Sequence, residues 1–350
     1  MICLGFDTSN YTTSVAAFDG AAGDNVSRLL PVKAGELGLR QSEALFSHIK
    51  RLPELSDRLF AHLDRSKIQA VGVSTRPRAV EGSYMPCFLA GESQAKVLAS
   101  VLHVPLVAFS HQQGHIAAVL WSAGRLDLLG SEFLAWHLSG GTTELLHVRT
   151  TTDGEIDCEK IGGTTDISAG QLIDRTGQLL GLDFPAGKAL DALAGQRSEI
   201  KDQGSGSVGG VLDVPQVSVS TRLCSGAQCC YSERSKESVS PHSPEWFRVK
   251  VNGCEFSLSG VENQVRAFRD RGASEAETAY FALRSALEAV KKVTKNACKE
   301  HDLPVIFSGG VASNSMLRRM MPGAIFGTPQ YSTDNAMGIA VLTWLKQNAG

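Results

Sequence analysis

Gly5-Phe6-Asp7-Thr8-Ser9-Asn10 stands near the start of the chain and gives the first indication of its architecture. The stretch begins in one apolar run, Ile2–Phe6, and leads to a second, Ser14–Phe18; both runs are short and suited to buried strands. We therefore predict two strands joined by a polar turn, with hydroxyl and carboxylate groups gathered at a strand end.

The same plan recurs later in the chain. Phe133–Leu138 leads into Ser139-Gly140-Gly141-Thr142-Thr143 and the apolar run Glu144–Val148, and Pro304–Phe307 leads into Ser308-Gly309-Gly310. Glycine lets backbone N–H groups approach phosphate oxygens, and hydroxyl groups add uncharged donors. One such turn alone is most simply a tight turn, but three in order favour a nucleotide site. The candidate residues are Asp7, Thr8, Ser9, Ser139, Gly140, Gly141, Thr142, Gly309 and Gly310.

Helical and strand patterns alternate along the chain, which is typical of an α/β fold. At 350 residues the chain is longer than one hydrophobic core usually supports, so we expect two lobes and a cleft between them. We place the N-terminal lobe at 1–130 and the C-terminal lobe at 131–350, with the last helix packing back on the first lobe. Glycine, serine and small polar residues dominate 203–243, which we interpret as a flexible insertion.

Composition restricts the partners and the compartment. The formal charge of -2 provides no field that would hold a polyanion, so nucleic acid would need a local patch or companion proteins. The chain has no basic leader followed by an apolar stretch and no apolar run long enough to span a membrane, which predicts a cytoplasmic protein. Cys224, Cys229, Cys230 and Cys254 match no usual zinc-binding spacing, although the sequence alone leaves that possibility open.

His111-Gln112-Gln113-Gly114-His115 places two imidazoles at i and i+4, on one face of a predicted helix. Two ligands of one metal can use this spacing, although a packed helix face explains it equally well. Asp334 is the best candidate for a third ligand; its alternative role is that of an ordinary N-cap of the last helix. Two histidines and a carboxylate suit Fe(II) or Zn(II), and the pattern does not separate the two.

Together these motifs resemble the transferases that make N6-threonylcarbamoyladenosine at position 37 of tRNA, which are also described as glycoprotease-like proteins. The resemblance spans nearly the whole chain and is specific. Beyond the motifs already quoted, it rests on Asp174-Arg175-Thr176-Gly177-Gln178-Leu179-Leu180-Gly181-Leu182-Asp183-Phe184-Pro185, Phe256-Ser257-Leu258-Ser259-Gly260, Ser308-Gly309-Gly310-Val311-Ala312-Ser313-Asn314 and Thr333-Asp334-Asn335.

The resemblance implies the two-lobed nucleotide-binding fold of actin, the heat-shock chaperone ATPases and the sugar kinases. It implies that His111, His115 and Asp334 hold the metal. It also implies that Ser139, Gly140 and Gly141, with Asp174, Gly187 and Asn314, surround an adenylate-bearing substrate, threonylcarbamoyl-AMP. The implied reaction moves the carbamoyl group onto N6 of adenosine 37 in tRNAs that read codons starting with A. Its implied partners are tRNA, a shorter inactive relative and an ATPase.

Three acids of the family pattern are replaced in this chain, by Gln113, Ile167 and Gln171. We expect their loss to remove negative charge from the cleft and to change how it handles a metal, a proton or an amine. Two alternatives to threonylcarbamoyl transfer therefore stay open. One is a non-catalytic nucleotide-binding paralogue that acts as a partner or regulator. The other is a different ATP-dependent carbamoyl or phosphoryl transfer on the same scaffold.

Overall fold

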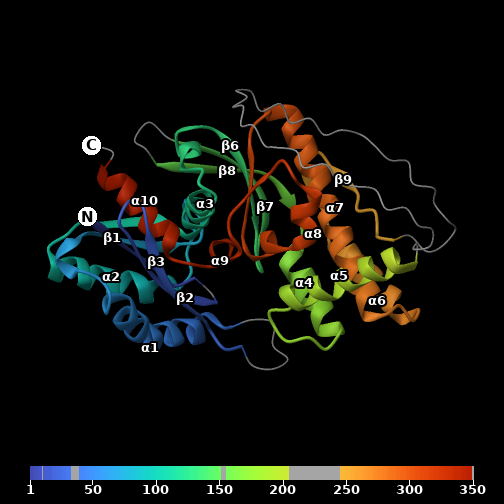
Figure 1. The fold of residues 1–350 in the computed structure, drawn as a ribbon, viewed down its shortest axis with the longest axis horizontal. Helices are drawn as coiled ribbons and strands as arrows, with labels where there is room; N and C mark the ends of the chain where they lie inside the picture. Colours follow the sequence, from blue (N-terminus) through green and yellow to red (C-terminus); the bar gives the residue numbers. More distant parts are fainter. Residues whose placement is uncertain (10, 33–38, 151–154, 205–244, 349–350) are drawn as a thin grey trace, which may run out of the picture.

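The computed structural model describes residues 1–9, 11–32, 39–150, 155–204 and 245–348, without the side chains of 198–204. Asn10, nearly all of the predicted insertion at 203–243, and Cys224, Cys229 and Cys230 lie outside the described residues. The two sheets lie at different positions along the long axis of the molecule (Figure 1). None of the described helices combines the length and apolar character needed to cross a bilayer.

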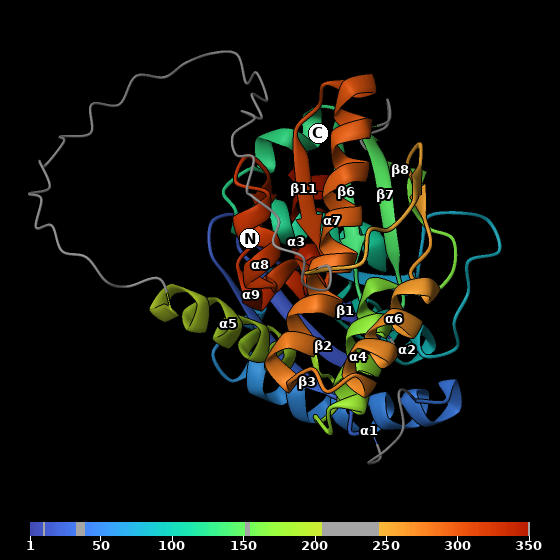
Figure 2. The same cartoon turned by 90° about the vertical axis from the view of Figure 1, so that its right-hand side faces the viewer.

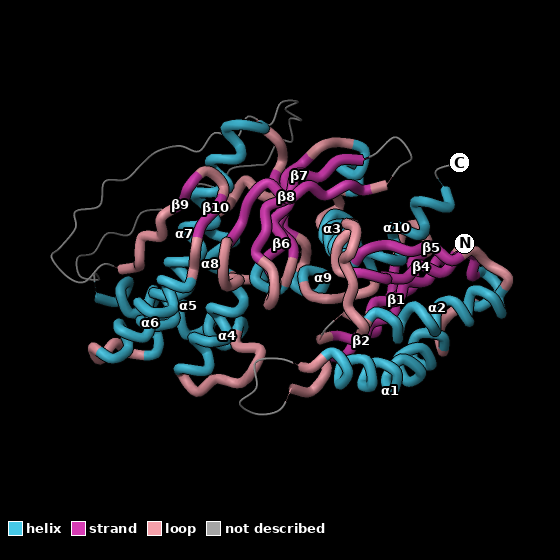
Figure 3. The backbone as a smooth tube through the Cα atoms, turned by 180° about the vertical axis from the view of Figure 1, so that it is seen from behind, coloured by secondary structure: helices cyan, strands magenta, loops and turns pink. Residues whose placement is uncertain are grey.

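The first sheet has the strand order β3-β2-β1-β4-β5. β1 pairs with β2 antiparallel, as predicted for the opening hairpin, and with β4 parallel. The sheet packs on α1 and α2 and, through β1, β2 and β4, on the last helix, α10; Figure 3 shows these elements from behind. The bounds are β1 Ile2–Asp7, β2 Thr12–Phe18, β3 Gly23–Leu29, α1 Gln41–Phe60, β4 Ile68–Arg76, α2 Phe88–Leu102, β5 Leu106–Ser110, α3 His111–Ser122 and α10 Met337–Asn348, with a 3-10 turn at Arg65–Lys67.

The second sheet has the order β12-β11-β6-β7-β8-β10-β9. β6 pairs antiparallel with β7 and parallel with β11. The predicted turns at 139–143 and 308–310 therefore leave the sheet at the same edge. The long helix α7 runs along this sheet (Figure 2). The bounds are β6 Phe133–Leu138, β7 Thr143–Thr150, β8 Ile156–Thr164, α4 Ala169–Leu179, α5 Gly187–Gly204, β9 Val251–Asn252, β10 Glu255–Phe256, α6 Ser259–Asp270, α7 Glu275–His301, β11 Val305–Ser308, α8 Ser315–Met320, β12 Ile325–Phe326 and α9 Pro329–Ser332, with 3-10 turns at Leu126–Gly130 and Gly310–Ser313.

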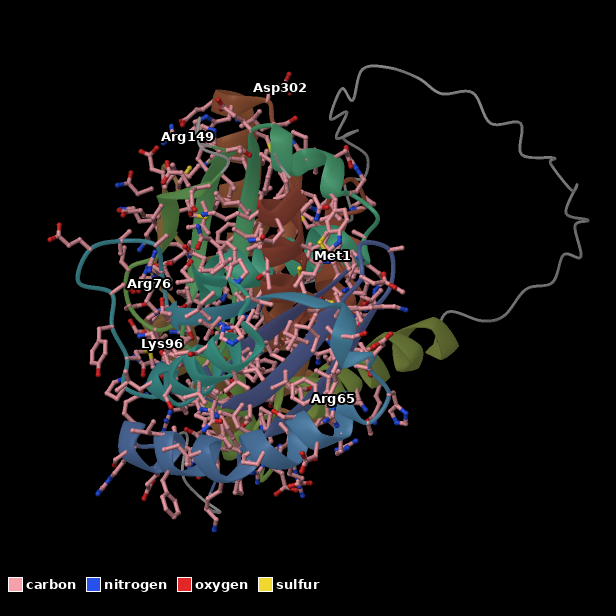
Figure 4. All side chains as sticks on the ribbon, turned by 90° about the vertical axis from the view of Figure 1, so that its left-hand side faces the viewer. Met1, Arg65, Arg76, Lys96, Arg149 and Asp302 are labelled. Carbon is pink, nitrogen blue, oxygen red and sulfur yellow. The ribbon has the colours of Figure 1, made fainter. Side chains whose placement is uncertain are left out.

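Local sequence explains where the long helix α7 begins and ends. Ser274 caps α7 and forms a capping box with Glu277, and the helix stops at Asp302, whose φ of 45° is left-handed. Figure 4 shows Asp302 and Arg149, close to the end of β7, at the same end of the molecule. The C-terminal ends of α7 and β7 therefore lie at the same end of the lobe.

Two glycines set the distance between α3 and α10. A Cβ on Gly338 would lie 1.8 Å from the carbonyl oxygen of Gly114, and a Cβ on Gly114 would lie 2.9 Å from Ile339. The two helix backbones therefore touch, which only glycine permits at this crossing. The contact fixes α3, with its two histidines, against the helix that follows Asp334.

Candidate functional site

The two histidines of α3 and Asp334 come together at one point. Asp334 Oδ1 lies 3.2 Å from His115 Nε2 and 3.6 Å from His111 Nε2. Among the described residues, His111, His115 and Asp334 form a group whose ligating atoms all lie within 4.8 Å of one another. Two imidazole nitrogens and a carboxylate oxygen converging in a partly buried position fit a divalent first-row cation.

Asp334 does not cap the helix that follows it. Asn335 Oδ1 accepts a hydrogen bond from Met337 N at 3.0 Å, and its amide donates to the carbonyls of Thr333 and Tyr331. The N-cap alternative for Asp334 is therefore wrong. Its neighbour fastens the start of α10, and the carboxylate of Asp334 faces the histidines.

Asp7 supports the cluster from the first sheet. Its Oδ2 lies 2.7 Å from His111 Nδ1, and the other oxygen accepts from Ser9 N. A carboxylate on the far nitrogen of a histidine fixes the ring and leaves Nε2 for a metal. Asp7 was predicted as a nucleotide residue, but its contacts make it a support for His111.

The charges of the cluster are strongly coupled. Burial alone would lower the pKa of His111, but the charge of Asp7 and hydrogen bonds to Asp334 and Asp7 outweigh it and raise that pKa to about 10. Burial alone would raise the pKa of Asp334, but hydrogen bonds from the two histidines hold it well below its usual range. At neutral pH the metal-free cluster therefore carries an extra proton on His111.

Cation binding should release that proton. Since Nε2 must be deprotonated to coordinate, and the pKa of His111 is raised to about 10, metal binding near pH 7 should liberate about one proton per ion. Affinity should then rise with pH, approaching tenfold per unit below that pKa. Calorimetry in buffers of different ionisation enthalpy measures the proton count, and a count of zero would contradict it.

A second hollow opens beside the cluster. A cavity of about 520 Å³ is lined by five residues predicted from the sequence: Gly140, Asp174, Gly187, Gly310 and Asn314. A Cβ on Gly140 would meet nothing within 4 Å, so a ligand can approach its backbone closely. Thr333, which precedes Asp334 in the chain, also lines this cavity, so the cavity and the cation cluster share one segment.

The other predicted turn residues shape the turns without lining this cavity. Thr8 Oγ1 bonds the carbonyl of Cys87 and the N–H of Gly91, and so fastens the start of α2. Ser139 Oγ accepts from Thr142 N, closing the turn. Gly309 has a φ of 89° and packs on the Leu138 carbonyl, which explains the glycine without a ligand. The Ser9 hydroxyl is buried, and none of the described residues forms a hydrogen bond with it.

Two charged residues of the cavity were not among the predicted site residues. Asp191 lines it from the first turns of α5 and accepts bonds from Asn314 Nδ2 at 3.0 Å and Ser315 N at 2.8 Å. Lys188 lines it from the same helix. Lys188 and Asp191 follow Gly187 by one and four residues. This spacing could have identified them once α5 was recognised as a helix that starts at the cleft.

The three replaced acids lie in different surroundings, which corrects the expectation that all three change the charge of the cleft. Gln113 forms a capping box with Ser110 and donates from Nε2 to the Ile156 carbonyl at 2.8 Å, so it is a structural residue behind α3. Ile167 packs on the core of the second lobe. Gln171 lines a smaller cavity of about 120 Å³ together with Asp174 and Gly140, so it lies at the cleft.

Comparison with known proteins gives a consistent result. Residues 38–341 match the family model described as tRNA N6-adenosine threonylcarbamoyltransferase. Curated proteins of that name are similar: that of Carboxydothermus hydrogenoformans is 28% identical, covering 100% of this chain and 93% of that protein. That of Archaeoglobus fulgidus is 25% identical, covering 97% and 90%.

Solved structures show the fold. Full-length HypF in its phosphate- and nucleotide-bound form superposes with a TM-score of 0.56 at 13% identity, covering 99% of this chain and 55% of that one. Component A of the Acidaminococcus fermentans (R)-2-hydroxyglutaryl-CoA dehydratase gives 0.50 at 13% identity, covering both chains fully. The predicted two-lobed α/β fold of the actin, chaperone and sugar-kinase type is confirmed.

Proposed function

Because this chain belongs to the tRNA N6-adenosine threonylcarbamoyltransferase family, a family of acyltransferases, we propose that it transfers the threonylcarbamoyl group of threonylcarbamoyl-AMP to N6 of adenosine 37 in tRNAs reading codons that start with A. One observation carries the proposal: the cavity lined by Gly140, Asp174 and Asn314 adjoins the cation cluster through Thr333 and Asp334. An adenylate held in the cavity therefore has its acyl end within reach of the cluster.

We propose distinct roles for the residues around the adenylate. Asp174 Oδ1 accepts from Ala186 N at 2.9 Å, which fixes the carboxylate as an acceptor for ribose hydroxyls. The open backbone at Gly140 and Gly310 binds the phosphate, which becomes the leaving group. In the transfer, the amine nitrogen of the adenosine forms a bond to the carbamoyl carbon, the bond from that carbon to the phosphate oxygen breaks, and AMP leaves as the amine loses a proton.

We assign the cation, Fe²⁺ or Zn²⁺, to His111, His115 and Asp334. When bound it supplies a Lewis acid for the carbamoyl or phosphate oxygens. Asp7 fixes the orientation of the His111 ring through Nδ1. The close contact between Gly114 and Gly338 keeps α3 near α10. We likewise propose that the two lobes divide near residue 130, between β5 and β6, with α10 completing the first.

A companion protein is needed because the chain has no net positive charge to hold tRNA. We propose that one companion docks on the outer face of α1 and α2, where Phe46, Val97 and Val101 are 63%, 64% and 69% exposed. The two helices contact each other, and exposed large apolar side chains on neighbouring elements are a feature of protein-binding surfaces. An inactive relative and an ATPase are the companions that the family resemblance implies.

The test is a transfer assay with a tRNA transcript carrying A37, threonylcarbamoyl-AMP and the companion proteins of the same cell. We expect N6-threonylcarbamoyladenosine, detected by nucleoside mass spectrometry, and a loss of at least tenfold in Asp174→Asn. The position of Gln171 beside Asp174 favours the second candidate, a nucleotide-binding regulator. Retained AMP binding without any product, with companions present, would establish that candidate instead.

A further inference from the structure

Arg78 is a charged residue beside the cation cluster that the proposed chemistry leaves unused. It lies in the loop after β4, and the carbonyl of Pro77, the residue before it, accepts a hydrogen bond from Gln112 N at 3.0 Å. Gln112 follows His111 at the start of α3. The loop that carries Arg78 is therefore fastened to the first turn of α3, next to a member of the cluster.

Glu144 holds the Arg78 side chain from the second sheet. Glu144 stands opposite His137 across the β6–β7 pair, and opposite residues of an antiparallel pair project from the same face of a sheet. The ring centre of His137 is 5.0 Å from that of His115, so this face adjoins the cluster. Arg78 donates from Nε and Nη2 to the two oxygens of Glu144, at 3.1 and 2.8 Å. This bidentate pair fixes the plane of the guanidinium beside the cluster.

The guanidinium of Arg78 has donors that the protein does not use. Glu144 takes two of its five N–H groups, and the described residues offer no acceptor to the other three, two of which are on Nη1. Nη1 and Nη2 present parallel N–H bonds, the arrangement that binds a carboxylate through both oxygens. The side chain is 44% exposed, so it is open to a ligand.

The charge around this guanidinium favours an anion. Lys160 Nζ lies 3.5 Å from Glu144, so two cations surround one carboxylate. The Glu144 side chain is 11% exposed, whereas those of Arg78 and Lys160 are 44% and 50% exposed. The negative group is therefore covered and the two cations face solvent, so a ligand that approaches this place meets positive charge.

We infer that Arg78 binds the free carboxylate at the acyl end of the substrate and selects the donor by it. This inference rests on the proposed function and adds a specificity residue to it. The threonylcarbamoyl group carries the carboxylate of threonine on the side of the carbamoyl carbon opposite the phosphate. The nucleotide cavity meets the cluster through Thr333 and Asp334, whereas Arg78 meets it through α3 and β7 and does not line that cavity. An acyl group that extends from the cavity across the cluster ends at Arg78.

The experiment uses the full chain loaded with Zn²⁺ and two hydrolysis-resistant sulfamate analogues of threonylcarbamoyl-AMP. One analogue keeps the threonine carboxylate, and the other has a neutral carboxamide in its place. We expect the wild type to bind the carboxylate analogue roughly tenfold more tightly by calorimetry, as a bidentate charged pair allows. Arg78→Met should bind the two analogues within about twofold of each other, because the fork is lost, and should bind AMP as the wild type does.

Arg149→Met is the matched control. Arg149 also pairs with two carboxylates, Asp157 and Glu159, but lies near the C-terminal end of β7, away from the cluster (Figure 4). This variant should keep the preference of the wild type for the carboxylate analogue. A preference that survives in Arg78→Met would assign the threonine carboxylate to the cation and overturn the inference.

The wild type alone also gives an answer, which does not depend on a variant folding. Equal affinities for the two analogues in a wild type that binds AMP would overturn the inference and leave the proposed function standing. A wild type that binds neither AMP nor the analogues would contradict the proposed function, and the inference with it.

Discussion

Asp334→Asn should weaken binding of Fe²⁺ or Zn²⁺ by at least a hundredfold. The carboxylate is the one anionic group among the three clustered ligands, and an amide of the same shape is a far poorer ligand. A hundredfold loss corresponds to about 2.7 kcal/mol of binding free energy. Competition titration against a chromophoric chelator, with metal content measured after dialysis, gives the affinity.

The adjacent residue provides the control for this prediction. Asn335→Ala removes the acceptor for Met337 N and should cost about 1 kcal/mol of unfolding free energy. The Asp334 carboxylate is unchanged in this variant, so most of the cation affinity should be retained. Equal losses of affinity in the two variants would show that the order of the loop, and not the carboxylate of Asp334, determines binding.

The histidine pair was predictable because its signal is local. An i and i+4 spacing puts His111 and His115 on one face of any helix, whatever the rest of the fold does. The third ligand, Asp334, was predicted from its place just before the last helix and from the family resemblance, because it lies 219 positions from His115 and shares no local pattern with it. The close crossing at Gly114 and Gly338 brings the two segments together, and it leaves no periodic pattern in the sequence.

Tertiary pairing explains what the sequence did not reveal. β3, Gly23–Leu29, was not predicted because it is largely polar and partly exposed, and it becomes a strand only by pairing with β2 along its whole length. Asp7 was assigned to the nucleotide because it belongs to a phosphate-type turn. In the structure the first residue of α3, His111, lies against its carboxylate.

Substitutions at family positions were also ambiguous without the structure. Gln113 lies one turn or less from both histidines in sequence, which suggested a place in the cleft. Helical geometry turns it to the opposite side of α3, where its amide bonds Ser110 and the Ile156 carbonyl. Glutamate could accept from Ser110 but could not donate to Ile156, so glutamine has a structural reason at this position.

Gly140→Val should weaken adenine-nucleotide binding at least tenfold while leaving the fold intact. A Cβ at Gly140 meets no protein atom within 4 Å, and Gly140 lines both the cavity of about 520 Å³ and the smaller one beside it. A valine side chain would therefore project into the ligand space and hold the phosphate away from the backbone. We expect at least a tenfold loss of AMP affinity, equivalent to about 1.4 kcal/mol, by calorimetric titration.

Gly130→Val is the matched control, because a Cβ at Gly130 also meets nothing within 4 Å and Gly130 does not line the cavity of about 520 Å³. Both variants should unfold within about 0.5 kcal/mol of the wild type, as surface changes usually do. If Gly140→Val bound AMP as tightly as Gly130→Val, the phosphate could not lie against the Ser139-Gly140-Gly141 turn. The nucleotide would then have to enter from the side of Lys188 and Asp191, and the order of groups along the cleft would be reversed.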